Sequence, residues 1–327
     1  MVSGRRDWTE ETLIAGVRSG DKRALARAIT LVENGDPLAY AVVGELYRDT
    51  GRAHSLGVTG PPGVGKSTLI GALVHHVRKL DETVGVISVD PSSPFTSGAL
   101  LGDRIRLTEH FLDPGVFIRS MGSRGHLGGL SEATLQALLM MDAAGKDRIF
   151  IETVGAGQSE VEVIGIVDTV LLVLMPGSGD SIQALKAGIM EIPDVIAVNK
   201  MDHPAAKTMA NEVRSILALD RDREWKPPIV LTEAARGEGV ADLWGKIEEH
   251  RAYLEASGEL ERRRRENLAR EVFGVATARA KEHLVQAVQG NPDLRRLLDA
   301  VQARELDPLS AVREILEQVF HIPPRDA

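Results

Sequence analysis

The sequence predicts an α/β protein in which helices cover a mainly parallel sheet and further helices extend both ends of the chain. Between Ser55 and Thr232, short runs rich in Val and Ile alternate with helical stretches. The runs are nearly continuous in apolar character, which is typical of strands buried on both faces of a parallel sheet. They are SLGVT, TVGVISVD, VFIRSM, RIFIET, TVLLVLM, VIAVNK and PIVLT. On either side of this block, the apolar residues follow a helical period.

Both ends of the chain are predicted to be helical. Residues 8–50 should form helices that break at Ser19-Gly20-Asp21, with an apolar face made of Leu13, Val17, Leu25, Ile29 and Leu31. After residue 250 we expect one long helix, then two shorter helices that open at Asn291-Pro292 and Asp307-Pro308. The run Arg262–Arg265 is interpreted as a solvated face of the long helix.

These patterns divide the chain into an N-terminal helical extension (1–50), an α/β domain (51–250) and a C-terminal helical region (251–327). The long helix carries an apolar stripe, which must be buried against its own domain or against a second subunit. That stripe consists of Leu268, Val272, Val275, Leu284 and Val288.

Composition excludes several classes of protein. The 327 residues carry a net charge of −8, which argues against nucleic acid or an anionic membrane as a partner. There is no cysteine, so disulfides and thiolate metal sites are excluded. No secretory signal and no apolar run of membrane-spanning length is found, so we expect a cytoplasmic protein.

A phosphate-binding loop follows the first predicted strand. Gly60-x4-Gly65-Lys66-Ser67 lies between an apolar strand and a helical pattern, as this motif requires. Glycines let backbone N–H groups turn toward an anion, and the helix N-terminus adds its positive dipole end. Lys66 is expected to reach the β- and γ-phosphates, and the Ser67 hydroxyl to bind Mg²⁺. The candidate loop comprises Gly60, Pro61, Pro62, Gly63, Val64, Gly65, Lys66, Ser67 and Thr68.

A guanine-reading motif ends the sixth predicted strand. In Asn199-Lys200-Met201-Asp202, the Asp202 carboxylate can accept from both N1–H and the exocyclic amine of guanine, a donor pair that adenine lacks. The apolar stem of Lys200 can cover the ring. After the last strand, Glu233-Ala234-Ala235 stands where a backbone N–H usually meets the guanine oxygen, although the usual Ser is replaced by Ala234.

Three acidic residues lie between these motifs. Asp90, Asp103 and Glu152 would repel a nucleotide unless they surround Mg²⁺. Asp90 has an alternative interpretation as part of an ordinary Asp-Pro turn. Glu152 and Gly155 form a Glu-x-x-Gly segment that should sense the γ-phosphate.

Hydrolysis by the isolated chain is expected to be slow. Ala156 stands where a self-sufficient GTPase places its water-orienting Gln, and Gln158 comes too late in the chain for that role. Two glycine-rich segments, 120–131 and 175–188, are expected to be mobile. The second offers a switching ion pair of Asp180 with Lys186, or else a solvent loop that opens a helix; Arg124 in the first is a candidate arginine finger.

Together these residues resemble the MeaB/ArgK/MMAA GTPases, the G-protein chaperones of adenosylcobalamin-dependent methylmalonyl-CoA mutase and related enzymes. The segments that carry the resemblance are GVTGPPGVGKSTL, VDPSSPFTSGALLGDRIRL, IETVGAGQSE, VLMPGSGDSIQALKAGIMEI and AVNKMD. The resemblance implies a P-loop NTPase fold, GTP or GDP and Mg²⁺ as ligands, and a homodimer formed largely by the C-terminal helices.

The resemblance also implies a function and roles for single residues. The chain would hydrolyse GTP, dock on an acyl-CoA mutase and gate cofactor loading, protection and reactivation. Asp90, Asp103 and Glu152 would serve Mg²⁺ and the attacking water, and segment 175–188 would be an extra switch. The chain lacks an Asp-x-His-x-x-Gly cobalamin motif, so it is not expected to hold cobalamin itself.

Two other functions remain open on the sequence alone. A metallochaperone GTPase would need clustered metal ligands, but the nine His are scattered, apart from His75-His76. A small-molecule kinase linked to basic amino-acid transport would need an acceptor pocket with a base, and no such pattern is evident.

Overall fold

The computed structural model describes residues 8–90, 108–122, 129–153, 165–177, 193–220 and 224–321. The chain divides into two compact units, Met1–Glu271 and Val272–Ala327. The first unit contains the N-terminal helices and the sheet. The assignment of 1–50 and 251–327 to separate functional regions stays a prediction.

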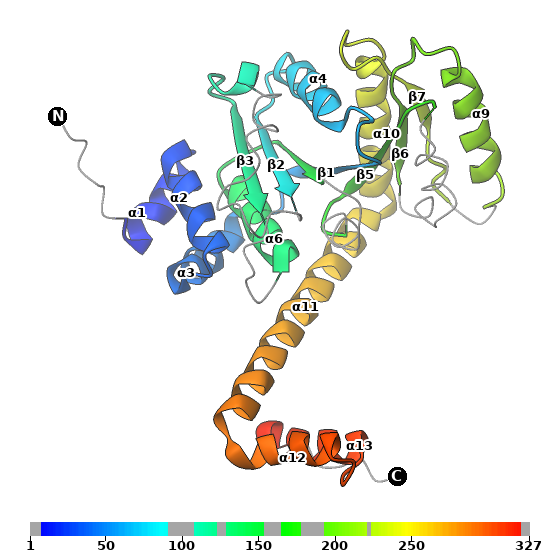
Figure 1. Cartoon of the computed structure of the whole chain (residues 1–327). Coiled ribbons are helices and arrows are strands. Elements are labelled where there is room, and N and C mark those ends of the chain that lie inside the picture. The colour runs from blue at the N-terminus through cyan, green and yellow to red at the C-terminus, as the bar shows by residue number, and fades with distance from the viewer. Residues whose placement is uncertain are drawn as a thin grey trace. The chain divides into compact units, whose positions relative to one another are not determined.

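The first unit is built on a parallel sheet with the strand order β3-β2-β4-β1-β5-β6-β7 (Figure 1). Every described pairing between strands of this sheet is parallel. The predicted fold class is therefore confirmed. The strands are β1 (His54–Thr59), β2 (Val84–Asp90), β3 (Val116–Gly122), β4 (Arg148–Thr153), β5 (Thr169–Leu174), β6 (Val195–Val198) and β7 (Ile229–Leu231).

Helices cover both faces of this sheet because alternate residues of each strand point to opposite sides. On β4, Phe150 packs with the helices α4 and α10, whereas Ile149 and Ile151 pack with α6 on the other face. Helix α9 covers β6 and β7 on the same face as α6. These helices are α4 (Lys66–Arg78), α6 (Gly129–Ala143), α9 (Ala206–Leu217) and α10 (Val240–Ser257).

The N-terminal helices form a further layer on α6. Each is capped by a polar side chain of the kind that favours a helix start, namely Thr9, Asp21 and Asp36. The predicted apolar face is buried throughout. The elements are α1 (Glu10–Arg18), α2 (Lys22–Glu33), α3 (Pro37–Leu46) and the 3₁₀ turn η1 (Tyr47–Asp49); a second 3₁₀ turn, η2, covers Thr108–His110.

The second unit contains helices alone among its described residues. Helix α11 (Glu259–Gly290) begins in the first unit and ends in the second, where α12 (Pro292–Gln302) and α13 (Pro308–Phe320) follow. Asn291 and Asp307 cap these two helices, as the Asn-Pro and Asp-Pro steps predict. Large apolar side chains remain exposed in this unit, namely Val272, Phe273, Val285, Leu298, Leu309 and Val312. Among the described helices, none has the length and apolarity needed to span a bilayer.

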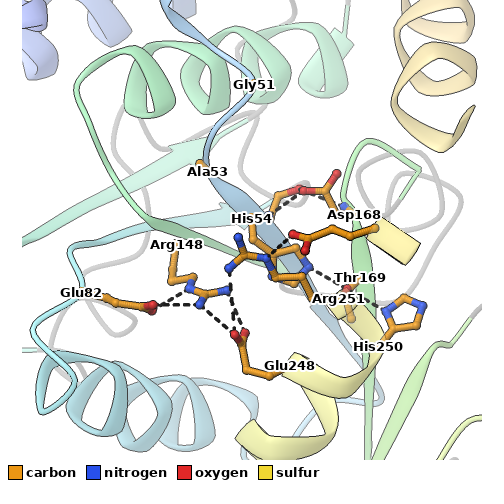
Figure 2. Close-up of polar contacts among 12 residues, drawn as sticks. Gly51, Ala53, His54, Glu82, Arg148, Asp168, Thr169, Glu248, His250 and Arg251 are labelled. Carbon is orange, nitrogen blue, oxygen red and sulfur yellow. Dashed lines mark hydrogen bonds and ion pairs between the residues drawn. The ribbon is translucent and has the colours of Figure 1, made fainter. Parts of the chain in front are cut away.

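The amino edge of the sheet, where the strands begin, is closed by buried ion pairs (Figure 2). The Arg148 guanidinium at the start of β4 donates to Glu82 at 2.6 and 2.9 Å and to Glu248 of α10 at 2.8 and 3.0 Å. It also lies 4.9 Å from the ring centre of Trp244. The Arg148 side chain is 3% exposed, so this charge is almost fully enclosed by its partners.

Two arginines at the start of α11 join this edge, which corrects the expectation that Arg262–Arg265 is a solvated face. Arg263 donates to the Asp194 carboxylate at 2.7 and 3.1 Å, and Arg264 to that of Asp168 at 2.7 and 2.8 Å. Both aspartates are buried. The prediction holds for Arg262, which is exposed and pairs with glutamates of its own helix. Sequence alone does not reveal the pairs because about 70 to 100 residues separate the partners.

Candidate nucleotide site

The candidate phosphate loop connects β1 to α4 at the carboxyl edge of the sheet. Gly60 has φ of +141°, and any side chain there would collide with the carbonyl oxygen of Val173 on β5. Gly65 has φ of +95°, and a Cβ would lie 2.5 Å from the Asn199 side-chain nitrogen. Both positions therefore require glycine, for backbone conformation and for space.

Lys66 begins α4 and its ammonium folds back over the loop. Nζ donates to the carbonyl oxygens of Gly60 at 2.5 Å and Pro61 at 3.2 Å. The side chain is buried, so the positive charge is concentrated at the centre of the loop. The N-terminus of α4 points to the same place, which makes the loop suited to a phosphate.

A hydroxyl and a carboxylate meet beside the loop. Ser67 Oγ donates to Glu152 Oε1 at 2.6 Å, and both side chains are buried. Glu152 is carried there by β4, where it lies in register with Val58 of β1 and Ser88 of β2. Such hard oxygen ligands suit Mg²⁺. Asp90 ends β2 at the same edge, but its side chain is not among those that the structure describes.

Asn199 connects the phosphate loop to the two strand ends beside it. Its Nδ2 donates to the carbonyl oxygen of Val64 at 2.8 Å. Its Oδ1 accepts from Thr232 Oγ1 at 3.2 Å and from the Ala234 N–H at 3.1 Å. Asn199 therefore positions the loops, a role that the sequence pattern did not identify. Its partners, which lie in the phosphate loop and just after β7, are far from Asn199 in the chain.

The remaining residues of the base motif lie at the solvent side. Lys200 has φ of +59°, is exposed, and donates through Nζ to the Gly63 carbonyl oxygen at 3.4 Å. Asp202 is exposed. The neighbouring Glu233 carboxyl lowers the pKa of Asp202, and the Asp202 carboxyl raises the pKa of Glu233. Ala235 is exposed beside them.

Several candidate residues lie outside the described residues. They are Asp103, Arg124, Gly155, Gln158, Asp180 and Lys186. The structure thus brings together the phosphate loop, Glu152, the base motif and the Glu233–Ala235 loop. Their proposed roles follow from the chemical groups that these residues carry.

A phosphate loop after the first strand of a parallel sheet, next to an Asn-Lys-x-Asp strand end, defines the class of P-loop GTPases. The family model described as "Methylmalonyl Co-A mutase-associated GTPase MeaB" matches residues 25–292. The chain belongs to this MeaB family of GTPases.

Individual relatives agree with this assignment. A putative GTPase of Pyrococcus horikoshii is 47% identical over 315 residues, covering 94% of this chain and 98% of the relative. The mitochondrial "Methylmalonic aciduria type A homolog" of Mus musculus is 35% identical over 273 residues, covering 78% of this chain and 66% of the mouse protein. A crystal structure of a protein called "LAO/AO transport system kinase" matches with a TM-score of 0.72 and 29% identity, covering 97% of this chain and 100% of that chain.

Proposed function

We propose that this GTPase is a chaperone of an adenosylcobalamin-dependent acyl-CoA mutase of the methylmalonyl-CoA mutase type. It would dock on the mutase and use GTP to gate cofactor loading, protection and reactivation, without holding cobalamin itself. The observation that carries the proposal is the match over residues 25–292 to a family described by its association with that mutase. The name of the mouse relative, which refers to methylmalonic aciduria, supports the same partner.

In this proposal the carboxyl edge binds the nucleotide. Residues 60–68 hold the phosphates, with the Lys66 ammonium moving from the loop carbonyls to the β- and γ-phosphates. Asp202 accepts from guanine while Lys200 covers the ring and Asn199 holds the loops in place. The 233–235 loop closes the base site. The buried position of Lys66 and the bridging hydrogen bonds of Asn199 support this arrangement.

Magnesium would be held on the same side of the loop. Ser67 and Glu152 already lie within hydrogen-bond distance of one another, and Asp90 and Asp103 are proposed to complete the set. When bound, the ion would neutralise phosphate charge as the bond to the γ-phosphate breaks. Glu152 would orient the attacking water through its carboxylate. Gly155 would meet the γ-phosphate through its backbone N–H.

The proposal assigns activation to the partner. Ala156 provides no side chain that could orient water, so the mutase is proposed to complete the site. Gln158 and the Asp180–Lys186 pair are proposed as the segments that respond to nucleotide and partner.

We further propose a homodimer through the C-terminal region and a cytoplasmic location. The exposed apolar side chains of the second unit, such as Phe273 at 72% and Leu309 at 77%, support a protein interface there. Light scattering of the purified chain should give the mass of a dimer. Phe273→Glu should reduce that mass to one chain.

The decisive experiment measures GTP turnover with and without purified methylmalonyl-CoA mutase. The mutase should bind the chain and raise turnover, and Lys66→Ala should abolish the increase. If the mutase neither binds nor changes turnover, the chaperone proposal is wrong.

The similarity to a protein called a transport system kinase suggests a second candidate, a small-molecule kinase. The same assay, run with radiolabelled GTP and arginine or ornithine, separates the two. Transfer of the γ-phosphate to the amino acid instead of water would favour the kinase.

A further inference from the structure

A groove alongside α4 adjoins the candidate nucleotide site. It has a volume of about 610 Å³ and lies between α4, the 3₁₀ turn η2 and the loop that leads into α10. Thr68, which ends the candidate phosphate loop, lines this groove, and so do Ala234 and Ala235 of the loop proposed to close the base site. The groove is therefore continuous with both halves of the proposed nucleotide site.

Hydrogen bonds hold the walls of this groove in place. On one side, the buried His110 ring donates from Nε2 to the Gly71 carbonyl oxygen at 3.1 Å, which fastens η2 to α4. On the other side, the Ala234 N–H donates to Asn199 Oδ1 at 3.1 Å. Between the walls, α4 presents the small residues Gly71 and Ala72, which leave room for a ligand. The volume and the fixed walls are those expected of a small-molecule site.

Most of the ionisable side chains in the groove are basic. Arg236 and His75 both line it, and both are exposed. Within the described part of the chain, neither side chain forms an ion pair or a side-chain hydrogen bond. The acid of the groove, Glu109, is 71% exposed and lies 3.3 Å from His110 Nε2. A chain with a net charge of −8 thus presents a guanidinium without an ion-pair partner beside its nucleotide site, which suits an anionic ligand.

The place of the ribose follows from the two ends of the nucleotide. If the phosphates lie at loop 60–68 and the base lies at the strand ends after β6 and β7, the ribose bridges them beside the groove. His75 comes seven residues after Thr68, about 10 Å along the helix axis, and its side chain leans back toward the helix N-terminus. Lys79 also lines the groove, but about 16 Å from Thr68 along the axis. An anionic group on the ribose is therefore closer to His75 and Arg236 than to Lys79.

We propose that this groove binds phosphate groups carried on a ribose hydroxyl, so that the chain accepts guanosine nucleotides phosphorylated at both the 5′ and the 3′ positions. This inference rests on the proposed guanine site. The Arg236 guanidinium pairs with the added phosphate, and the His75 imidazole donates a hydrogen bond to it. A nucleotide of this class with a 5′-diphosphate has no γ-phosphate, so it occupies the site, excludes GTP and inhibits GTP turnover.

The test compares GDP with guanosine 5′-diphosphate 3′-diphosphate by isothermal titration calorimetry in excess Mg²⁺. The wild-type chain should bind the 3′-diphosphate compound about tenfold more tightly than GDP, because charge-assisted hydrogen bonds are gained. Arg236→Ala and His75→Ala should each reduce this ratio, and the double variant should bring it close to one. The ratio is measured because a change in the shared guanine site affects both ligands alike. Lys79→Ala, the more distant cation of the same groove, is the control and should keep the wild-type ratio.

The outcomes separate this inference from the site on which it rests. Equal affinities of the wild-type chain for the two compounds would overturn the inference and leave the guanine site intact, and so would a preference that persists in the double variant. Asp202→Asn must weaken both ligands, because both are proposed to place guanine in the same site. If that variant bound GDP unchanged, or if the wild-type chain did not bind GDP, the guanine site would be wrong and this inference with it.

Discussion

The two edges of one parallel sheet use charged residues in opposite ways. At the amino edge, Arg148, Asp168 and Asp194 are buried and each is enclosed by oppositely charged or hydrogen-bonding partners. At the carboxyl edge, Lys66 donates to loop carbonyls and the Ser67 hydroxyl donates to the Glu152 carboxylate. The contacts of the first edge are complete within the chain, whereas those of the second are suited to an added anion, cation and base.

This contrast implies that the two edges can be disrupted separately. A buried charge whose partner is removed destabilises the fold, because its desolvation is no longer offset. A polar group that faces a ligand contributes mainly to binding and catalysis, so its removal should leave the fold intact. Variants at the two edges should therefore differ in which measurement they change.

The largest effect is expected at the phosphate loop. Lys66→Ala should lower the rate of GTP hydrolysis by at least about a hundredfold, because the charge that stabilises the transferring phosphate is lost. The melting temperature should change by no more than about 2 °C, since a group that faces a ligand contributes mainly to binding and catalysis. Lys79→Ala, an exposed lysine just past the other end of α4, should retain wild-type turnover. Near-normal turnover in Lys66→Ala would contradict the nucleotide site.

At the amino edge, the first turns of α11 provide two arginines that can be compared directly. Arg264→Ala leaves Asp168 buried without its guanidinium, which should cost about 3 kcal/mol of unfolding free energy. Arg262→Ala removes an exposed arginine two residues earlier and should leave the unfolding free energy within about 0.5 kcal/mol of wild type. Urea unfolding measures both, and equal stabilities would refute the distinction between buried and solvated arginines on this helix.

The next effect concerns the start of β4. Arg148→Met keeps the apolar stem but removes the charge shared by Glu82 and Glu248, with an expected cost of about 2 kcal/mol. The cost is smaller than for Arg264, because both glutamates are about one-third exposed and water can solvate them. Arg251→Ala, on the same helix as Glu248, is the control and should cost little. A loss of GDP affinity in Arg148→Met at unchanged stability would contradict the separation of the edges.

The sequence predicted the fold and the carboxyl edge because both depend on local patterns. Apolar runs marked the strands within one or two residues, and the phosphate loop and base motif each occupy consecutive positions. It did not predict the amino edge, because Arg148 meets Glu248 across 100 residues and Arg264 meets Asp168 across 96. From the sequence alone, a buried arginine of this kind cannot be told from one that is exposed to solvent. The hydrogen bonds of Asn199 were not predicted for the same reason, because its partners are far away in the chain.

The smallest effect is a change in the pH dependence of stability. Burial, the largest cause, lowers the pKa of His54 to about 3, from an ordinary value of 6.5. Its Nε2 hydrogen-bonds with Thr169 Oγ1 at 2.9 Å, which in turn bonds with His250 Nδ1 at 2.9 Å (Figure 2). The folded chain therefore keeps His54 neutral at pH values where the unfolded chain protonates it.

The sign of the effect follows from proton linkage. Because the folded pKa lies below the unfolded one, the stabilisation is complete above pH 6.5 and is lost as the pH falls toward 3. Between pH 6.5 and pH 5, wild type should lose roughly 1.5 kcal/mol more stability than His54→Gln, which retains a polar partner for Thr169 but does not titrate. Urea unfolding at each pH measures this difference. Equal losses would mean that the folded protein accepts a proton at His54. The amino edge would then accommodate an added charge, as the nucleotide edge is proposed to do.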